Sequence, residues 1–113
     1  MWIMIAGPYR TEATSEADRE RNLRALNSAA VEVFRKGHTP IIGVNLALPL
    51  IQAAGAESYD TIMMPLSLAL ADRCDAVLRL DGRSAGADEE VERVRARGGS
   101  VYRSVGDVPD VGR

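Results

Sequence analysis

The chain has 113 residues, 46% apolar and 27% charged, with a formal net charge of −2 at pH 7, one cysteine and one histidine. These totals fit one soluble globular domain, residues 1–113. They exclude a Cys/His zinc site within the chain and a general electrostatic attraction to polymeric nucleic acid or to an anionic membrane. Because no apolar run reaches the roughly 20 residues of a membrane span and the first residues lack the pattern of a secretory signal, we expect a cytoplasmic protein.

The N-terminal half begins with the continuous apolar run MWIMIA (1–6), which is typical of a strand buried on both faces and ends at GPYR (7–10). A polar stretch and then apolar residues at helical spacing predict a helix that ends at Gly37. TPIIGV (39–44) is the second predicted strand. Residues 45–64 are ambiguous, and we expect helical turns within a long connection.

The C-terminal half continues the alternation. PLSLALADR (65–73) predicts a helix with Pro65 at its first position. AVLRL (76–80) predicts the third strand, residues 86 to about 97 the next helix, and SVYRSV (100–105) a short edge strand. Helical crossovers between successive strands indicate an α/β fold with a parallel sheet.

A parallel sheet of four to five strands in the order 2-1-3-4 has a topological switch between strands 1 and 3. Ligands bind outside the carboxyl ends of the strands at such a point. The loops that meet there are GPYR after strand 1 and DGRSAG after strand 3. We therefore expect the two loops to line one binding site.

One acidic residue of the last helix differs from its neighbours. Ala87, Val91 and Val94 form one face at 100° per residue, and Glu90 borders that face. Glu90 lies within about the first turn, where the helix dipole favours an ionised carboxylate. A carboxylate there is suited to nucleophilic attack or base work. The alternative is an acidic first turn that only stabilises the helix.

The two loops carry further candidates. Arg10 is able to pair with a phosphate or a carboxylate, and Tyr9 to pack on a sugar or a base. Ser84 precedes a helix N-terminus, where free N–H groups form an anion cradle. The alternatives are a plain turn for the first loop and an ordinary N-cap for Ser84.

The helix over 65–73 has little polar face, which indicates burial on both sides. A domain of this size hardly encloses such a helix alone, so we predict a subunit interface there, most simply in a homodimer. Arg79, inside an apolar strand, is assigned to the same contact. Met63 and Met64 are interpreted as core or interface residues.

Three segments together, IMIAGPYR, DRCDAVLRLDG and SAGADEEVERVRARG, resemble the nucleoside 2-deoxyribosyltransferase-like superfamily. That superfamily includes the 2-deoxyribosyltransferases, the 2′-deoxynucleoside 5′-phosphate N-hydrolases and short uncharacterised bacterial relatives, to which this chain is most similar. The resemblance implies a small flavodoxin-like or Rossmann-like three-layer sandwich, usually in dimers or dimers of dimers.

The resemblance also implies roles for individual residues. The family nucleophile is a glutamate in a pattern like S-x-G-x-x-x-E, which Ser84, Gly86 and Glu90 match here. The family loop after strand 1 contacts the sugar or the 5′-phosphate, and Ser84 falls where relatives contact the 5′ group. The residues of that loop in this chain are Gly7, Tyr9 and Arg10.

The implied reaction is a retaining exchange at the N-glycosidic bond of a nucleoside or nucleoside 5′-monophosphate. Glu90 attacks the anomeric carbon to give a covalent glycosyl–enzyme, and water or a second base then takes the sugar. No metal or organic cofactor is required. Relatives often carry an aspartate that protonates the departing base, but the matching position here is Ser67, so Asp81 is the substitute candidate. The alternatives are a module that binds nucleotides without cleaving them and a structural protein without a ligand.

Overall fold

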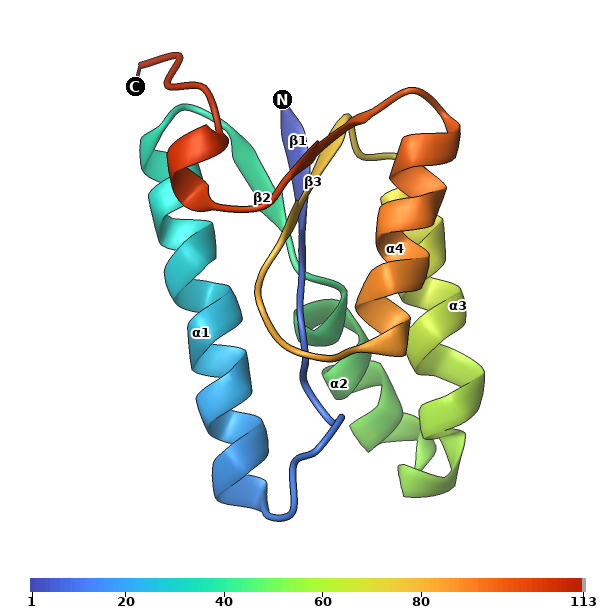
Figure 1. The fold of residues 1–113 in the computed structure, drawn as a ribbon. Coiled ribbons are helices and arrows are strands. Elements are labelled where there is room, and N and C mark those ends of the chain that lie inside the picture. Colours follow the sequence, from blue (N-terminus) through green and yellow to red (C-terminus); the bar gives the residue numbers. More distant parts are fainter. Residues whose placement is uncertain (113) are drawn as a thin grey trace.

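The computed structural model describes residues 1–112, which form a four-stranded parallel sheet in the order β2-β1-β3-β4 (Figure 1). The predicted α/β class and strand order are confirmed. The strands are β1 (Trp2–Ala6), β2 (Thr39–Ile41), β3 (Ala76–Arg79) and β4 (Ser100–Tyr102).

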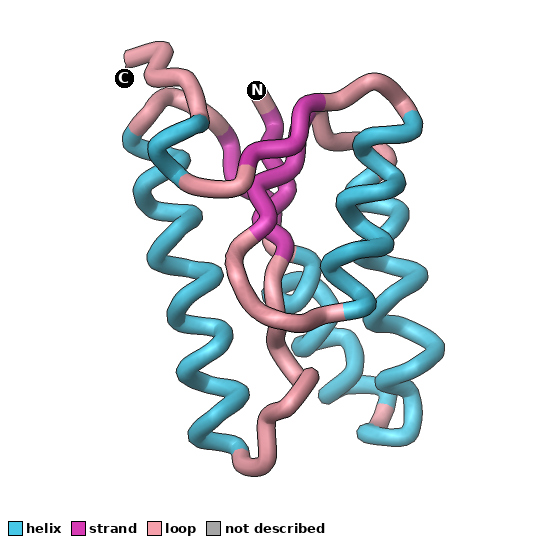
Figure 2. The backbone as a smooth tube through the Cα atoms, viewed as in Figure 1, coloured by secondary structure: helices cyan, strands magenta, loops and turns pink. Residues whose placement is uncertain are grey.

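Helices cover both faces of this sheet and give three layers. In the described part of the chain, α1 lies on one side of the strands, and α3 and α4 lie on the other (Figures 1 and 2). None of these helices has the length and apolar character needed to cross a membrane. The helices are α1 (Glu16–Arg35), α2 (Gly43–Ala54), α3 (Tyr59–Ala71) and α4 (Ala85–Ala96), with single 3-10 turns at Ala56–Ser58 and Val105–Asp107.

The position of β1 in the middle of the sheet explains why its sequence is apolar without alternation. Ile3 and Ile5 belong to the core cluster that includes α1, whereas Met4 and Ala6 belong to the cluster formed with α3 and α4. Successive side chains of a strand point to opposite faces. Because both faces are covered, every position of β1 from Ile3 onward is buried.

Three predicted boundaries are wrong. The second strand ends at Ile41 rather than at residue 44, because α2 begins at Gly43. The last strand ends at Tyr102, before a 3-10 turn. Pro65 is not the first residue of a helix but lies inside α3, which begins at Tyr59. A proline inside a helix removes one backbone hydrogen bond, and here the packing of α3 on its neighbours outweighs that cost.

The apolar character of α3 has a partial explanation within the chain. This helix packs against α2 on one side and α4 on the other. Leu66 packs on the α2–α3 cluster, and Leu70 packs on the cluster that contains α4. Its own chain therefore covers much of the surface from which the homodimer is predicted, and the subunit contact stays a prediction.

Candidate active site

The two loops expected to meet do so at the carboxyl ends of β1 and β3. Ala6 pairs with Arg79 at the end of the two strands, and the Leu80 amide still donates to the Ala6 carbonyl at 2.8 Å. The loops that follow therefore leave the sheet side by side at the same end (Figure 2). Gly82 has a φ of 113°, and a Cβ there would lie 2.7 Å from Pro8 Cγ. Only glycine permits this contact between the loops.

A hollow of about 180 Å³ opens beside these loops. It is far larger than the ~10–15 Å³ that one water needs. Five segments contribute to its wall: the end of β1 with its loop, the middle of α1, the start of α2, α3, and the first turns of α4. The polar side chains and glycines of the lining are Gly7, Tyr9, Arg10, Thr11, Gly43, Tyr59, Ser67, Ser84, Gly86 and Glu90. The remaining lining residues are Ile5, Leu26, Val44, Met63, Met64 and Ala87.

Glu90 lies in the second turn of α4 and is only 8% exposed. It follows Ala87 and precedes Val91, both of which are core residues. None of the side-chain hydrogen bonds or ion pairs found among residues 1–112 involves Glu90. Buried carboxyl groups almost always have partners, so this one is available to a molecule in the hollow.

Burial raises the pKa of the Glu90 carboxyl from 4.5 to about 8, against an opposing effect of the Arg79 guanidinium and with a smaller rise from Glu89. The helix dipole, which favours an ionised carboxylate near a helix N-terminus, does not offset the effect of burial here. The dipole acts mainly within the first turn, whereas Glu90 lies one turn further on and is desolvated. The acid form of Glu90 predominates at neutral pH.

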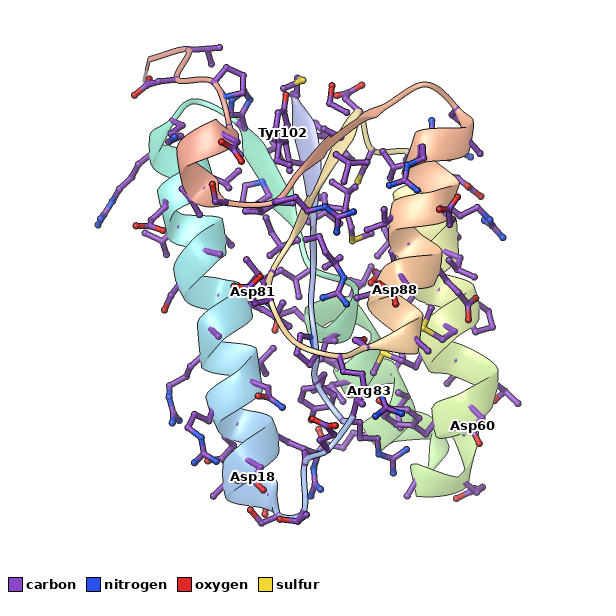
Figure 3. The ribbon with its side chains drawn as sticks, viewed as in Figure 1. Asp18, Asp60, Asp81, Arg83, Asp88 and Tyr102 are labelled. Atoms are coloured by element: carbon purple, nitrogen blue, oxygen red, sulfur yellow. The ribbon has the colours of Figure 1, made fainter. Side chains whose placement is uncertain are left out.

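Arg79 is as buried as Glu90 but is fully engaged within its own chain. Its guanidinium donates to Asp88 Oδ1 at 3.1 and 3.2 Å, to the Gly82 carbonyl at 2.9 Å and to the Leu80 carbonyl. Asp88 lies on the flank of α4 toward the loop after β3 (Figure 3). These bonds fix the loop against the helix and account for the buried guanidinium within the chain, and a subunit contact of Arg79 stays a prediction.

Asp81 does not reach the hollow. It is exposed, lies on the loop after β3 (Figure 3), and lines a separate depression together with Arg79, Asp88 and Arg103. Asp88 and Glu90 are about 200° apart around α4, and Asp81 lies on the Asp88 side. The structure therefore does not place Asp81 where the prediction of a proton donor to a leaving base requires it.

The position at which the resemblance expects an acid does face the hollow. Ser67 is 3% exposed and lines the hollow from α3. A Cβ on Gly43 would lie 2.2 Å from Ser67 Oγ and 2.9 Å from its Cβ. α2 and α3 therefore approach closely at this point because position 43 has no side chain. The residue that they bring to the hollow is a hydroxyl rather than a carboxyl.

The loop after β1 brings Tyr9 and Arg10 to the hollow. Asn22 Nδ2 on α1 donates to the Tyr9 carbonyl at 2.8 Å and holds the loop. Arg10 is exposed, and its guanidinium carbon lies 3.8 Å from the centre of the Tyr59 ring. This distance is that of a cation–π contact. Six predicted residues, Gly7, Tyr9, Arg10, Ser84, Gly86 and Glu90, thus lie around one hollow.

Ser84 is confirmed as the N-cap of α4, and its role in binding an anion stays a prediction. Its Oγ accepts the Ala87 amide at 3.1 Å as the N-cap of α4, and the residue also lines the hollow. Gly86 is next to Met64, because a Cβ there would lie 2.9 Å from Met64 Sδ. The absence of a side chain lets the thioether approach the start of α4.

The lining residues that the sequence did not predict include three from α3, namely Tyr59, Met63 and Met64. Met63 and Met64 were interpreted as core or interface residues, and Tyr59 was not considered. Met63 is a core residue of the α2–α3 cluster and also lines the hollow. The signal that would have found them is a helix that begins at Tyr59, which places positions 59, 63 and 67 on one face.

No protein-family model matches this chain, and no curated protein is similar to it. The family resemblance therefore rests on the three motifs, and the function is argued from the geometry of the site.

Proposed function

We propose that this hollow is an active site that cleaves or transfers the N-glycosidic bond of a nucleoside or nucleoside 5′-monophosphate, with Glu90 as nucleophile. The observation that carries the proposal is the Glu90 carboxyl, which is 8% exposed, lacks a partner among residues 1–112 and lines a concave site with Tyr9 and Arg10. A buried ionisable group with a strongly shifted pKa in a cleft is a mark of a functional site.

The chemistry follows from these positions. Ionised Glu90 attacks the anomeric carbon as the bond to the base nitrogen breaks, and the sugar becomes an ester of the glutamate. Water or an acceptor base then attacks the same carbon from the other side, which gives overall retention. Tyr9 and Tyr59 supply flat surfaces for a ring, and Arg10 is exposed at the hollow, where a 5′-phosphate on the substrate would find a cation.

The direct test compares the wild type with Glu90→Ala and Glu90→Gln on a panel of nucleosides and their 5′-monophosphates, with base release followed by chromatography. We expect turnover to fall by roughly 10⁴-fold or more in both variants, because removal of a nucleophile leaves only binding effects. Mass spectrometry of the quenched wild type should show a glycosyl adduct on the peptide that contains Glu90. Equal turnover in the three proteins would exclude Glu90 as nucleophile.

A second function is favoured by one specific observation. Glu90 is the only carboxyl among the described residues that line the hollow, so a neutral base has no acid to protonate it. This arrangement suits a module that binds a nucleotide without cleaving it. A thermal shift with nucleotides, in the absence of both turnover and a Glu90 adduct, would support binding alone. An adduct on Glu90 would exclude it.

A further inference from the structure

The hollow offers a nucleophile but no separate acid. Its ionisable lining groups are Tyr9, Arg10, Tyr59 and Glu90. Arginine stays protonated at any working pH, and a phenol with a pKa near 10 is a weak acid at neutral pH. Burial raises the pKa of the Tyr59 phenol further, against the opposing effect of Arg10. If Glu90 attacks, no group in the wall readily supplies a proton to the leaving base.

This gap restricts the leaving group. A neutral purine or pyrimidine departs as an anion unless it is protonated, and general acid catalysis contributes about 10²–10⁴-fold to such steps. A base that already carries a positive charge needs no proton, because the electrons of the broken bond neutralise it. The hollow therefore has the groups needed to cleave a glycoside of a cationic base, but it lacks the acid needed to cleave one of a neutral base.

We propose that the site acts on N-glycosides whose base is cationic, such as N-pyridinium ribosides and N7-alkylpurine nucleosides. This inference rests on the proposed role of Glu90 as nucleophile. A Glu90 carboxylate oxygen bonds to the anomeric carbon, the carbon–nitrogen bond breaks, and its electron pair moves into the ring, so that the cationic base leaves as a neutral molecule. Water then adds to the anomeric carbon, the ester bond breaks, and the proton released by water returns to Glu90 or to solvent.

A cationic base also favours the ionised form of Glu90, which the nucleophilic attack requires. Glu90 is mostly protonated because it is desolvated. A neutral ligand that fills the hollow removes more water and keeps the carboxyl neutral, whereas a positive ring against Glu90 favours the carboxylate. The charged groups near it are Arg79 on β3, whose guanidinium is hydrogen-bonded to Asp88, Glu89 on α4, and the exposed Arg10. None of them faces Glu90 as a hydrogen-bond partner.

The aromatic wall supports the same substrate class. Arg10 already places a flat cation over Tyr59 at 3.8 Å, so this ring accepts a delocalised positive charge in this structure. Tyr9 and the Met64 thioether provide further polarisable surface. Repulsion from Arg10 is weak because that side chain is exposed and screened by solvent.

The experiment measures kcat/KM of the full chain for two matched pairs: 7-methylguanosine against guanosine, and the N-riboside of nicotinamide against its neutral 1,4-dihydro form. Each rate is divided by the uncatalysed rate of the same compound, because cationic nucleosides are intrinsically more labile. We expect the cationic member of each pair to show an enhancement at least about 100-fold larger, and the enhancement should be lost in Glu90→Gln.

A variant provides the converse test. Ser67→Asp supplies the missing acid, so we expect it to increase cleavage of guanosine by about 10-fold or more without a matching gain on 7-methylguanosine. Ser67→Asn is the control of equal size without an acid and should show no gain. If crowding by Gly43 prevents Ser67→Asp from folding, the substrate pairs in the wild type decide the matter alone.

The outcomes separate this inference from the proposed function. Equal enhancement for neutral and cationic partners, abolished by Glu90→Gln, would overturn the preference for cationic bases and leave the glycosidase intact. Absence of cleavage of all four compounds, together with absence of a Glu90 adduct, would overturn both. Cleavage that persists in Glu90→Gln would also overturn both, because the nucleophile would lie elsewhere.

Discussion

Arg79 and Glu90 are equally buried and near each other, yet their surroundings are opposite. Each is 8% exposed. The Arg79 guanidinium donates to two backbone carbonyls and to Asp88. The Glu90 carboxyl has no hydrogen-bond or ion-pair partner among residues 1–112 and lines a hollow. The fold thus satisfies one buried ionisable group completely and leaves the other facing the hollow without a protein partner among residues 1–112.

The difference is between a buried charge that has protein partners and a buried ionisable group that lacks them. Removing a partner from a satisfied buried charge destabilises a protein, whereas neutralising an unsatisfied one relieves a desolvation cost. Substitutions at the two positions should therefore have opposite signs. That expectation does not require the substrate to be known.

The largest effect is expected from Glu90→Gln at alkaline pH. The native carboxyl has a pKa of about 8, against 4.5 for an ordinary glutamate. Between these values the native state holds a proton that the unfolded chain has lost, so wild-type stability falls as pH rises through this window. The variant should be more stable by on the order of a few kcal/mol above pH 8 and nearly equal to wild type at pH 4. Urea unfolding across pH tests this, and a constant difference would contradict it.

Arg79→Met should shift stability in the other direction. It removes the bonds to the Leu80 and Gly82 carbonyls and the ion pair with Asp88, and we expect a loss of roughly 2–4 kcal/mol. Asp88→Asn is the matched control. Its side chain is 70% exposed, so the loss should stay below about 1 kcal/mol. If the control costs as much as Arg79→Met, the carbonyl bonds are not what stabilises the loop.

Gly43 on α2 and Ser67 on α3 allow a further comparison within the wall of the hollow. A Cβ at position 43 would meet both Oγ and Cβ of Ser67, so Gly43→Ala should destabilise the chain by roughly 1–3 kcal/mol. Ser67→Ala alone should have a smaller effect because the hydroxyl makes no hydrogen bond within residues 1–112. The double variant should stay destabilised, since the Cβ contact remains. Rescue by Ser67→Ala would show that only the hydroxyl is crowded.

The smallest effect is expected from the exposed cation. Arg10→Met should leave thermal stability nearly unchanged, because the side chain is exposed. If Arg10 pairs with a 5′-phosphate, the preference in kcat/KM for a monophosphate over its nucleoside should fall by about tenfold, or about 1.4 kcal/mol. Arg83→Met is the control, since Arg83 is an exposed arginine on the neighbouring loop that does not line the hollow. An equal change in both variants would indicate a general charge effect.

Much of the site follows from local signals in the chain. Three of these signals are short-range properties of the chain: the glycine and proline that end the first apolar run, the N-cap at Ser84, and the helical period that separates Glu90 from the other acids of α4. They place Tyr9, Arg10 and Glu90 at one end of a parallel sheet once the strand order is inferred. Tyr59, Met63 and Met64 could not be placed in the same way. Pro65 is typical of a first helical position and therefore predicts too late a start for α3, whereas packing against α2 allows the helix to begin at Tyr59.

The sequence alone determined the α/β class of the fold, because the hydrophobic periods of strands and helices are properties of neighbouring residues. The strand order and the two loops that meet were predicted from that class, and the structure confirms them. Only the tertiary structure decided that Asp81 faces away from Glu90, that Arg79 is bound within its own chain, and that the Glu90 carboxyl holds a proton at neutral pH. Those outcomes depend on desolvation and on contacts between segments far apart in the chain, which no local pattern encodes.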